Sequence, residues 1–268
     1  MGTPAEATPP GLPDPPPPEE APGRRRVAGS LLFAAGQAAA TVAFALAGLL
    51  TAPLSWRWRY AFITRWSRLN LWWLRRSCGL AWRVEGLERL PPGPAVVLSK
   101  HQSAFETLLF QLILPPQTWV LKRELLWIPF FGWGLALLEP IAIDRKAGRE
   151  AVRRLLAAGR RRLAQGRWVI VFPEGTRVPP GQRRRYGLGG ALLAEHARVP
   201  VVPVAHNAGE YWPRRGLVKR EGVIRVAVGP VIEARGRRAP EILAEAEAWI
   251  EAATARLSHL GGGGGEGA

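Results

Sequence analysis

A histidine and a carboxylate five residues apart, His101 and Glu106, are the side chains best suited to chemistry in this sequence. A histidine has a near-neutral pKa and can remove a proton from an attacking hydroxyl, while a carboxylate can orient its ring. Five residues of a continuous helix turn through about 140°, so the two side chains can meet only if His101 precedes the helix. Ser103 and Glu106 form the Ser-x-x-Glu pattern of a capping box, which predicts that Ser103 is the N-cap residue of the helix. Alternatively, Glu106 only caps that helix and His101 only fills the turn.

A second polar segment, Phe172-Pro-Glu-Gly-Thr-Arg177, ends the apolar run 168–172. Because ligands of open α/β sheets bind at the carboxyl ends of the strands, this segment is expected at a ligand site. The planar guanidinium of Arg177 suits a phosphate monoester, and Thr176 and the Gly175 backbone can add hydrogen-bond donors. Alternatively, Arg177 pairs with Glu174 in an ordinary turn.

Asp144 and Arg145 follow another apolar run, 141–143. Arg145 is a candidate second phosphate contact, because it too comes after an expected strand. Asp144 is expected to hold this arginine rather than to act in catalysis.

Together these motifs resemble those of the 1-acyl-glycerol-3-phosphate acyltransferases in the glycerolipid acyltransferase superfamily. The first motif of that family is a histidine followed, after four residues, by an aspartate. Three further blocks match in order: Glu139-Pro-Ile-Ala-Ile-Asp144-Arg145, Phe172-Pro-Glu-Gly-Thr-Arg177 and Val199-Pro-Val-Val-Pro-Val204. The resemblance covers residues 82–233.

The resemblance implies transfer of a fatty acyl group from acyl-CoA or acyl-carrier protein to the sn-2 hydroxyl of 1-acyl-glycerol-3-phosphate, which gives phosphatidic acid. His101 and Glu106 would be the catalytic pair, and the substrate-binding residues would be Arg145, Glu174, Gly175, Thr176 and Arg177. The family needs no metal or prosthetic group. A covalent mechanism through Ser103 is less favoured, because its expected role is the helix cap.

Two positions depart from the family pattern. Glu106 stands where the family has aspartate, so the carboxylate is one methylene further from its backbone. Lys100 stands where the family often has asparagine before the histidine. Both leave the chemistry possible but change how His101 must be oriented.

The elements that must position these residues form an alternating pattern from about residue 83. Short β-branched runs predict strands at 95–98, 118–121, 141–143, 168–172, 201–204 and 223–228. Helices are expected at 104–114, 149–165, 190–197 and 240–258. This alternation predicts an α/β catalytic domain over 82–260 with a mixed or largely parallel sheet flanked by helices.

The region before residue 82 has a different character. Residues 1–26 form a Pro-rich tail, expected to be disordered, that ends in three arginines. Residues 27–54 carry no charge and are long enough as a helix to span or to embed in a bilayer. A cleaved signal peptide fits less well because the apolar stretch is longer than usual. Residues 56–82 mix tryptophan with arginine, which favours a second helix at the membrane interface over a soluble helix with inward tryptophans. Residues 27–81 are therefore expected to form a membrane-anchoring helical region, and residues 261–268 a flexible Gly-rich tail.

Composition limits the partners. The net charge of +16 suits anionic partners, but most of the basic residues are arginine in an Ala-, Gly- and Pro-rich chain, which weakens that argument. A single cysteine, Cys78, excludes an intramolecular disulfide, and His196, His206 and His259 lack metal-ligand spacing, so no metal site is expected. His206 is expected to be a packed or capping residue.

Two other functions remain as alternatives. The acceptor could be another lyso-lipid, such as a lyso-ornithine lipid. A non-catalytic basic protein that binds membranes or nucleic acid would explain the charge but not the ordered motifs, so no nucleic-acid partner is expected. Soluble acyl donors predict an inner-membrane protein whose catalytic domain faces the cytoplasm.

Overall fold

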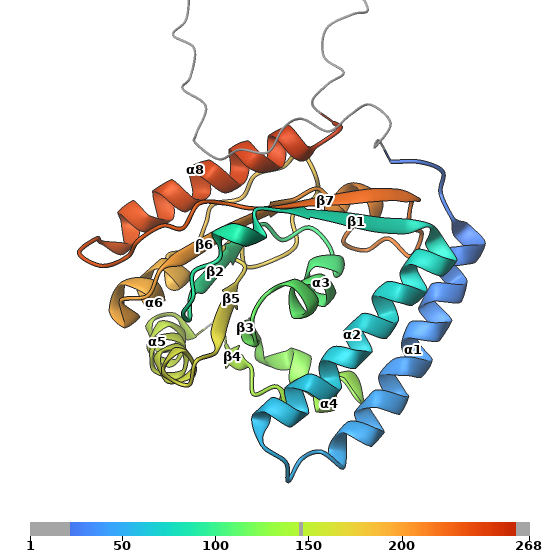
Figure 1. Ribbon diagram of the computed structural model, residues 1–268, viewed down its shortest axis with the longest axis horizontal. Coiled ribbons are helices and arrows are strands. Elements are labelled where there is room, and N and C mark those ends of the chain that lie inside the picture. The colour runs from blue at the N-terminus through green and yellow to red at the C-terminus, as the bar shows by residue number, and fades with distance from the viewer. Residues whose placement is uncertain (1–21, 145–146, 261–268) are drawn as a thin grey trace, which may run out of the picture.

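The computed structural model describes residues 22–144 and 147–260, in which seven strands form one sheet with helices on both faces (Figure 1). The strand order is β1-β7-β6-β2-β5-β3-β4. All neighbouring strands pair in parallel except β6 and β7, which are antiparallel. The strands are β1 (Leu80–Glu85), β2 (Val96–Ser99), β3 (Gln117–Lys122), β4 (Ile141–Ile143), β5 (Trp168–Val171), β6 (Val201–His206) and β7 (Gly222–Val228). The predicted mixed, largely parallel α/β fold is confirmed.

The helices divide between the two faces of this sheet. The helices are α1 (Val27–Leu49), α2 (Trp56–Cys78), α3 (Phe105–Ile113), α4 (Phe131–Leu137), α5 (Arg149–Ala164), α6 (Gly189–Ala197), α7 (Ala208–Tyr211) and α8 (Ala239–Leu257). Short 3-10 turns follow β1 (Leu87–Arg89) and β3 (Arg123–Trp127). One apolar layer joins the sheet to α1 through α4, and a second layer joins it to α5, α6 and α8.

The central strand β2 shows why continuous apolar runs form these strands. Val97 packs in the layer with α1 through α4, whereas Val96 and Leu98 pack in the opposite layer. Neighbouring side chains of a strand point to opposite faces, so a strand that is covered on both faces must be apolar at every position. The carboxyl ends of β2 and β5 therefore emerge side by side from a buried sheet.

The six predicted strands lie within two residues of their observed bounds, but β1, α4 and the short helix α7 were missed. β1 was absent from the prediction, and the helix expected to extend through Trp82 ends at Cys78. Gly79 causes this end, because it adopts a left-handed φ of 64° that stops the helix. Trp82 lies instead in β1 and packs on Phe105, so the sheet begins two residues before the predicted domain boundary. Helices α4 and α7 were also absent from the prediction.

The two N-terminal helices form a close hairpin that lies against α4 (Figure 1). The tryptophans of α2 divide between two environments, since Trp56 is buried and Trp58 is exposed. Before α1, Gly23 and Arg26 donate backbone hydrogen bonds to the carbonyls of Glu221 and Lys219, so this end of the predicted tail is paired. The rest of that tail, 1–21, and the predicted tail 261–268 lie outside the described residues.

Gly29 sets how closely α1 and α2 approach. A Cβ atom at this position would lie 1.9 Å from the backbone oxygen of Ser77 on α2. Gly29→Ala is therefore expected to push the helices apart and to lower the free energy of unfolding by about 1 to 3 kcal/mol. Thermal unfolding of the detergent-solubilised protein measures this. Gly93→Ala is the control, because a Cβ at Gly93 meets nothing within 4 Å. Equal stability of the two variants would contradict the close approach.

Candidate active site

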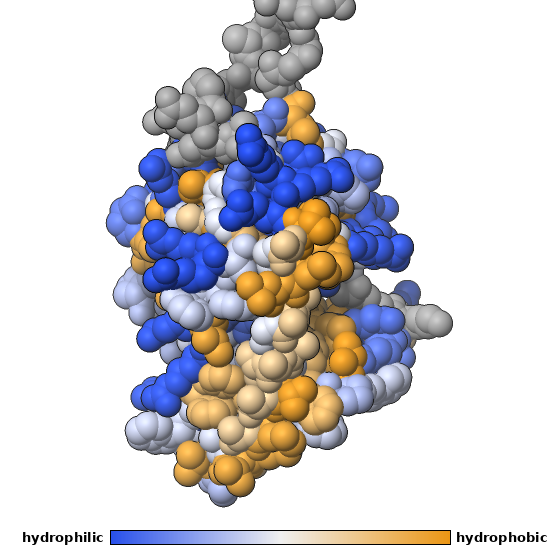
Figure 2. Space-filling view, turned by 90° about the vertical axis from the view of Figure 1, so that its right-hand side faces the viewer, coloured by the Kyte–Doolittle hydropathy of each residue, from blue (hydrophilic) through white to orange (hydrophobic). Residues whose placement is uncertain are grey.

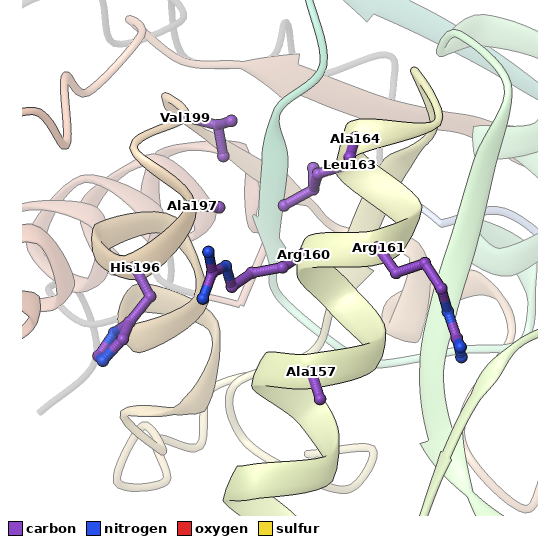
Figure 3. Close-up of a pocket in the computed structure, with 8 residues that line it drawn as sticks. All are labelled: Ala157, Arg160, Arg161, Leu163, Ala164, His196, Ala197 and Val199. Atoms are coloured by element: carbon purple, nitrogen blue, oxygen red, sulfur yellow. The ribbon is translucent and has the colours of Figure 1, made fainter.

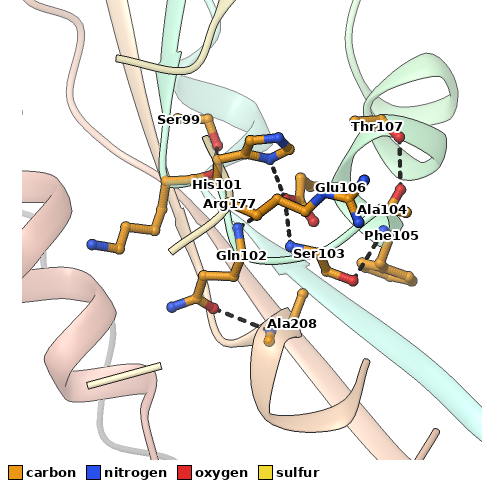
Figure 4. Close-up of polar contacts among 12 residues, drawn as sticks. Ser99, His101, Gln102, Ser103, Ala104, Phe105, Glu106, Thr107, Arg177 and Ala208 are labelled. Atoms are coloured by element: carbon orange, nitrogen blue, oxygen red, sulfur yellow. Dashed lines mark hydrogen bonds and ion pairs between the residues drawn. The ribbon is translucent and has the colours of Figure 1, made fainter. Parts of the chain in front are cut away.

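The turn between β2 and α3 brings His101 and Glu106 together (Figure 4). The imidazole Nδ1 of His101 lies 2.8 Å from Oε1 of Glu106. The same carboxylate oxygen accepts hydrogen bonds from the backbone N–H groups of Gln102 (3.0 Å) and Ser103 (2.9 Å). Because His101 precedes the helix, the carboxylate on the first turn of α3 can fold back to reach it. The predicted contact is therefore present, while the catalytic role of the pair stays a prediction.

The start of α3 differs in detail from the predicted capping box. The helix begins at Phe105, with Ala104 rather than Ser103 as the N-cap residue. Ser103 Oγ accepts the N–H of Phe105 (3.2 Å), and Glu106 accepts the N–H of Ser103. Glu106 therefore both closes the helix start and contacts His101. One carboxylate thus makes both the contact at the helix start and the contact with His101.

The charge state of Glu106 fixes the tautomer of His101. Burial alone would raise the pKa of Glu106, but His206, His101 and the N–H of Ser103 outweigh burial and hold this pKa below its ordinary value. An ionised carboxylate can only accept hydrogen bonds, so Nδ1 of His101 must donate. Nε2 is then the basic nitrogen of the ring. The ring also stacks on Phe172 at a centroid distance of 4.0 Å, which limits its rotation.

His206 lies on the buried side of the same carboxylate. Its Nε2 donates to the carbonyl of Lys100 (2.9 Å), and its Nδ1 accepts the N–H of Ala208 (3.3 Å). Burial lowers the pKa of His206, and the neighbouring carboxylate of Glu106 opposes this shift. Nε2 is 3.9 Å from Oε1 of Glu106. His206 is thus a packed residue, as the sequence predicted, and it borders the candidate catalytic pair.

The segment after β5 directs Glu174 and Arg177 to different surroundings. Glu174 is buried, accepts the backbone N–H of His101 (2.8 Å) and lies 2.8 Å from the ammonium of Lys100. Gly175 turns the chain with a φ of 69°, a left-handed conformation that favours glycine. Thr176 is half-buried beside it. The structure therefore directs Glu174 toward the core, away from the side on which substrate was expected.

Arg177 lies on the other side of this turn and lines a cavity together with His101. Its Nη1 donates to the carbonyl of Arg214 (3.0 Å), and Arg214 donates to the carbonyl of Arg177 (3.1 Å). Glu174 pairs with Lys100 instead, so the alternative Arg177–Glu174 pair is wrong. The two reciprocal bonds hold the guanidinium at the cavity.

Arg145 lies outside the described residues, so its predicted phosphate contact stays a prediction. Asp144, which was expected to hold Arg145, lies 3.4 Å from Nη2 of Arg123. Within the described residues, no group of three or more His, Cys, Asp or Glu side chains could hold a metal ion.

The cavity has a volume of about 710 Å³ and a largely apolar lining. His101, Arg177 and Lys122 are among its polar lining residues. Its apolar walls come from α1, α3 and α4 and include Ala38, Val42, Ala45, Leu108 and Leu135. The sequence did not predict α1 or α4 as walls, although the uncharged, alanine-rich character of α1 is the signal that could have indicated this.

A second cavity of about 520 Å³ lies between α5 and α6 (Figure 3). Its lining includes Arg160, Arg161 and His196. None of the site residues predicted from the sequence lines it, so the chemistry concentrates at the first cavity.

Comparisons with known proteins found similar sequences and a similar structure. A model of the acyltransferase family matches residues 81–207. The chain is 46% identical over 211 residues to the 1-acyl-sn-glycerol-3-phosphate acyltransferase of Pseudomonas aeruginosa, which covers 77% of this chain and 82% of that protein. It is 32% identical to the alpha form from Homo sapiens, over 67% of this chain and 65% of that protein, slightly less than two thirds of its length.

A solved structure is similar over most of the chain. The crystal structure of the 1-acyl-sn-glycerophosphate (LPA) acyltransferase PlsC from Thermotoga maritima matches with a TM-score of 0.71 and 22% identity. The match covers 90% of this chain and 98% of that one. At this identity the similarity shows a shared fold.

The low pKa of Glu106 predicts how stability depends on pH. A carboxyl whose pKa is lower in the folded than in the unfolded state stabilises the fold above the unfolded pKa, and this contribution is lost as pH falls through the folded pKa. Glu106→Gln should therefore lower the free energy of unfolding by about 1 to 3 kcal/mol at neutral pH. The difference in unfolding free energy between the variant and the parent protein should shrink as the pH falls below 4.5, the ordinary pKa of a glutamate. Urea unfolding across this range tests it, with the exposed Glu241→Gln as the control. A difference that is constant with pH would contradict the low pKa.

Proposed function

The chain belongs to the 1-acyl-sn-glycerol-3-phosphate acyltransferase family, and from this premise we propose that it transfers a fatty acyl group to the sn-2 hydroxyl of 1-acyl-glycerol-3-phosphate, giving phosphatidic acid. The donor is a thioester, either acyl-CoA or acyl-carrier protein. One observation supports the proposal: His101, which contacts Glu106, and Arg177 line the same largely apolar cavity. A lysophospholipid likewise combines a phosphate group with an apolar chain.

In the proposed mechanism, Nε2 of His101 removes the proton from the acceptor hydroxyl as its oxygen attacks the thioester carbonyl. The ionised Glu106 stabilises the imidazolium that forms, as a buried carboxylate does for a catalytic histidine. The new C–O bond forms, the C–S bond breaks, and the leaving thiolate takes the proton from the imidazolium. This chemistry requires no metal and no prosthetic group.

Arg177 is the proposed phosphate ligand. Its guanidinium is fixed by Arg214 and lines the cavity that contains His101. A planar guanidinium can donate two parallel hydrogen bonds to a phosphate monoester. Thr176, Gly175 and Arg145 remain proposed neighbours of that phosphate, while Glu174 contributes by holding the backbone of His101.

We also propose that the protein binds the membrane along α1. This helix is long and apolar enough to cross a bilayer, and only 17% of its most apolar window is buried. Several leucines of α1 are exposed, as are Trp127, Ile128 and Trp133, and Figure 2 shows extensive apolar surface on this side of the molecule. Because α1 also packs against α2 and α4, embedding in one leaflet explains the structure better than spanning the bilayer.

This arrangement favours direct access of lipid to the site. The residues of α1 that line the cavity belong to the helix proposed to lie in the membrane. The acceptor could thus reach His101 with its acyl chain among apolar side chains. Because thioester donors are soluble, we propose an inner-membrane location with the catalytic domain facing the cytoplasm.

The function is tested by release of free thiol from palmitoyl-CoA and by detection of phosphatidic acid. Both should depend on added 1-acyl-glycerol-3-phosphate. A lysophosphatidylcholine and a lyso-ornithine lipid should be poor acceptors, because neither has a phosphate monoester for the arginine site. Equal use of these acceptors would reject the proposed specificity, and thiol release without any acceptor would indicate a hydrolase.

In this assay, His101→Ala should abolish transfer and Glu106→Gln should lower turnover by about 100-fold or more, because the imidazolium loses its counter-charge. Glu106→Asp should be milder because the charge remains. Ser103→Ala is the control, since it removes a hydroxyl that accepts the N–H of Phe105 without removing the base. Loss of turnover in Ser103→Ala, with normal folding, would instead favour a covalent serine mechanism.

Arg177→Lys should weaken use of the acceptor while leaving the KM for the acyl donor unchanged. Lysine keeps the positive charge but lacks the planar guanidinium that donates two parallel hydrogen bonds. The expected loss in kcat/KM for the acceptor corresponds to about 1.5 to 3 kcal/mol. Arg184→Lys, at an exposed arginine beyond the same segment, is the matched control. If both variants behave alike, the phosphate ligand must be sought elsewhere, with Arg145 as the next candidate.

A further inference from the structure

Directly before His101, a lysine is buried in the core. The side chain of Lys100 is 1% exposed, and its ammonium lies 2.8 Å from Oε1 of Glu174 and 2.7 Å from Oε1 of Glu251. It also donates to the carbonyl of Gln182 (3.4 Å). Burial of a charge is costly unless partners compensate it, and here two carboxylates compensate the ammonium of Lys100.

The second carboxylate comes from the far end of the chain. Glu251 belongs to α8, which packs on β6 behind the active-site turn (Figure 1). Most of the buried face of this helix is apolar, including Ile242, Trp249 and Ile250. A buried acid on this face is directed at the residue that precedes His101.

Tyr186 and Arg183 complete the environment of Glu251. The buried hydroxyl of Tyr186 donates to Oε1 of Glu251 (2.8 Å), and Nε of Arg183 lies 3.5 Å from Oε2. Burial raises the pKa of Tyr186, so the hydroxyl remains a donor. Lys100 thus lies between the two carboxylates, and burial raises the pKa of Glu174 even though Lys100 opposes this shift.

The cluster reaches the proposed base through Glu174. One oxygen of Glu174 faces Lys100, and the other accepts the backbone N–H of His101 (2.8 Å). The carbonyl of His101 accepts the N–H of Val178 (2.7 Å), so both backbone groups of this residue are held. A shift of Glu174 would move His101 relative to its substrate.

We propose that Glu251 and Tyr186 are positioning residues for the acyl transfer, acting through Lys100 and Glu174 on the backbone of His101. This inference rests on the proposed function for its kinetic consequence. Its structural consequence, ordering of the His101 turn by α8, is measurable without activity.

The first test is Glu251→Gln, which keeps the size of the side chain and removes its charge. In thiol-release assays, kcat should fall by about 10- to 100-fold while the KM values for donor and acceptor stay unchanged, because the base is misplaced and the substrate ligands are not. Glu241→Gln, at an exposed position on the same helix, should match the parent protein. A folded Glu251→Gln variant with parental kcat would overturn the proposal.

A double variant of Lys100 and Glu251 distinguishes a positioning role from a general loss of stability. Lys100→Gln alone leaves the carboxylates of Glu174 and Glu251 without their shared cation, so its kcat should fall strongly. Adding Glu251→Gln removes one of these charges and should raise kcat above that of Lys100→Gln. Independent, multiplicative losses in the double variant would show that the two residues do not act as one unit.

Amide hydrogen exchange provides a readout that does not depend on activity. The N–H of His101 should exchange faster in Glu251→Gln than in Glu241→Gln, because its acceptor Glu174 is less well held. If Glu251→Gln is too unstable to study, Tyr186→Phe removes a single hydrogen bond and should give a smaller change in the same direction. Unchanged exchange at His101 in either variant would overturn the proposal even if the wild-type protein acylated no lysophospholipid.

Discussion

The buried carboxylate of Glu106 is the interaction on which the site depends. Its Oε1 lies 2.8 Å from Nδ1 of His101 and accepts hydrogen bonds from the N–H groups of Gln102 and Ser103. Three residues of the turn after β2 therefore contact a single carboxylate oxygen. That charge is tolerated in the core because His206, His101 and the N–H of Ser103 outweigh the cost of burial. The same interaction starts α3, orients the imidazole and leaves Nε2 as its basic nitrogen. Helix capping and proposed catalysis therefore cannot be separated by inspecting the sequence motif.

A second constraint comes from the turn after β5, which holds the backbone of His101 on both sides. Glu174 accepts its N–H, and Val178 donates to its carbonyl. Arg177 lies between these two contacts in the chain and projects to the cavity. Arg177, the proposed phosphate ligand, and His101, the proposed base, are thus linked through a few backbone bonds. This explains how one short segment can serve both the core and the proposed substrate site.

The N-terminal hairpin extends the site beyond the sheet. α1 contributes one wall of the apolar cavity, while its exposed face continues the apolar surface near α4. α2 is joined to the catalytic domain by an ion pair between Arg59 and Glu139 (2.6 Å) and by Trp56, whose Nε1 donates to the carbonyl of Leu138. The proposed membrane anchor and the proposed catalytic domain consequently share one core, rather than being connected by a flexible linker.

By itself, the sequence determined the six apolar strands, most helix bounds, and the need for His101 to precede its helix, because these follow from local periodicity and helix geometry. It did not indicate β1, whose mixed residues become a strand only by pairing with β7, more than 130 residues later. It also placed Glu174 on the substrate side, whereas the structure turns it toward Lys100 and Glu251. Nor did it identify α1 and α4 as cavity walls. Only the tertiary structure decided these points, because long-range pairing and the compensation of buried charge depend on residues that are distant in the chain.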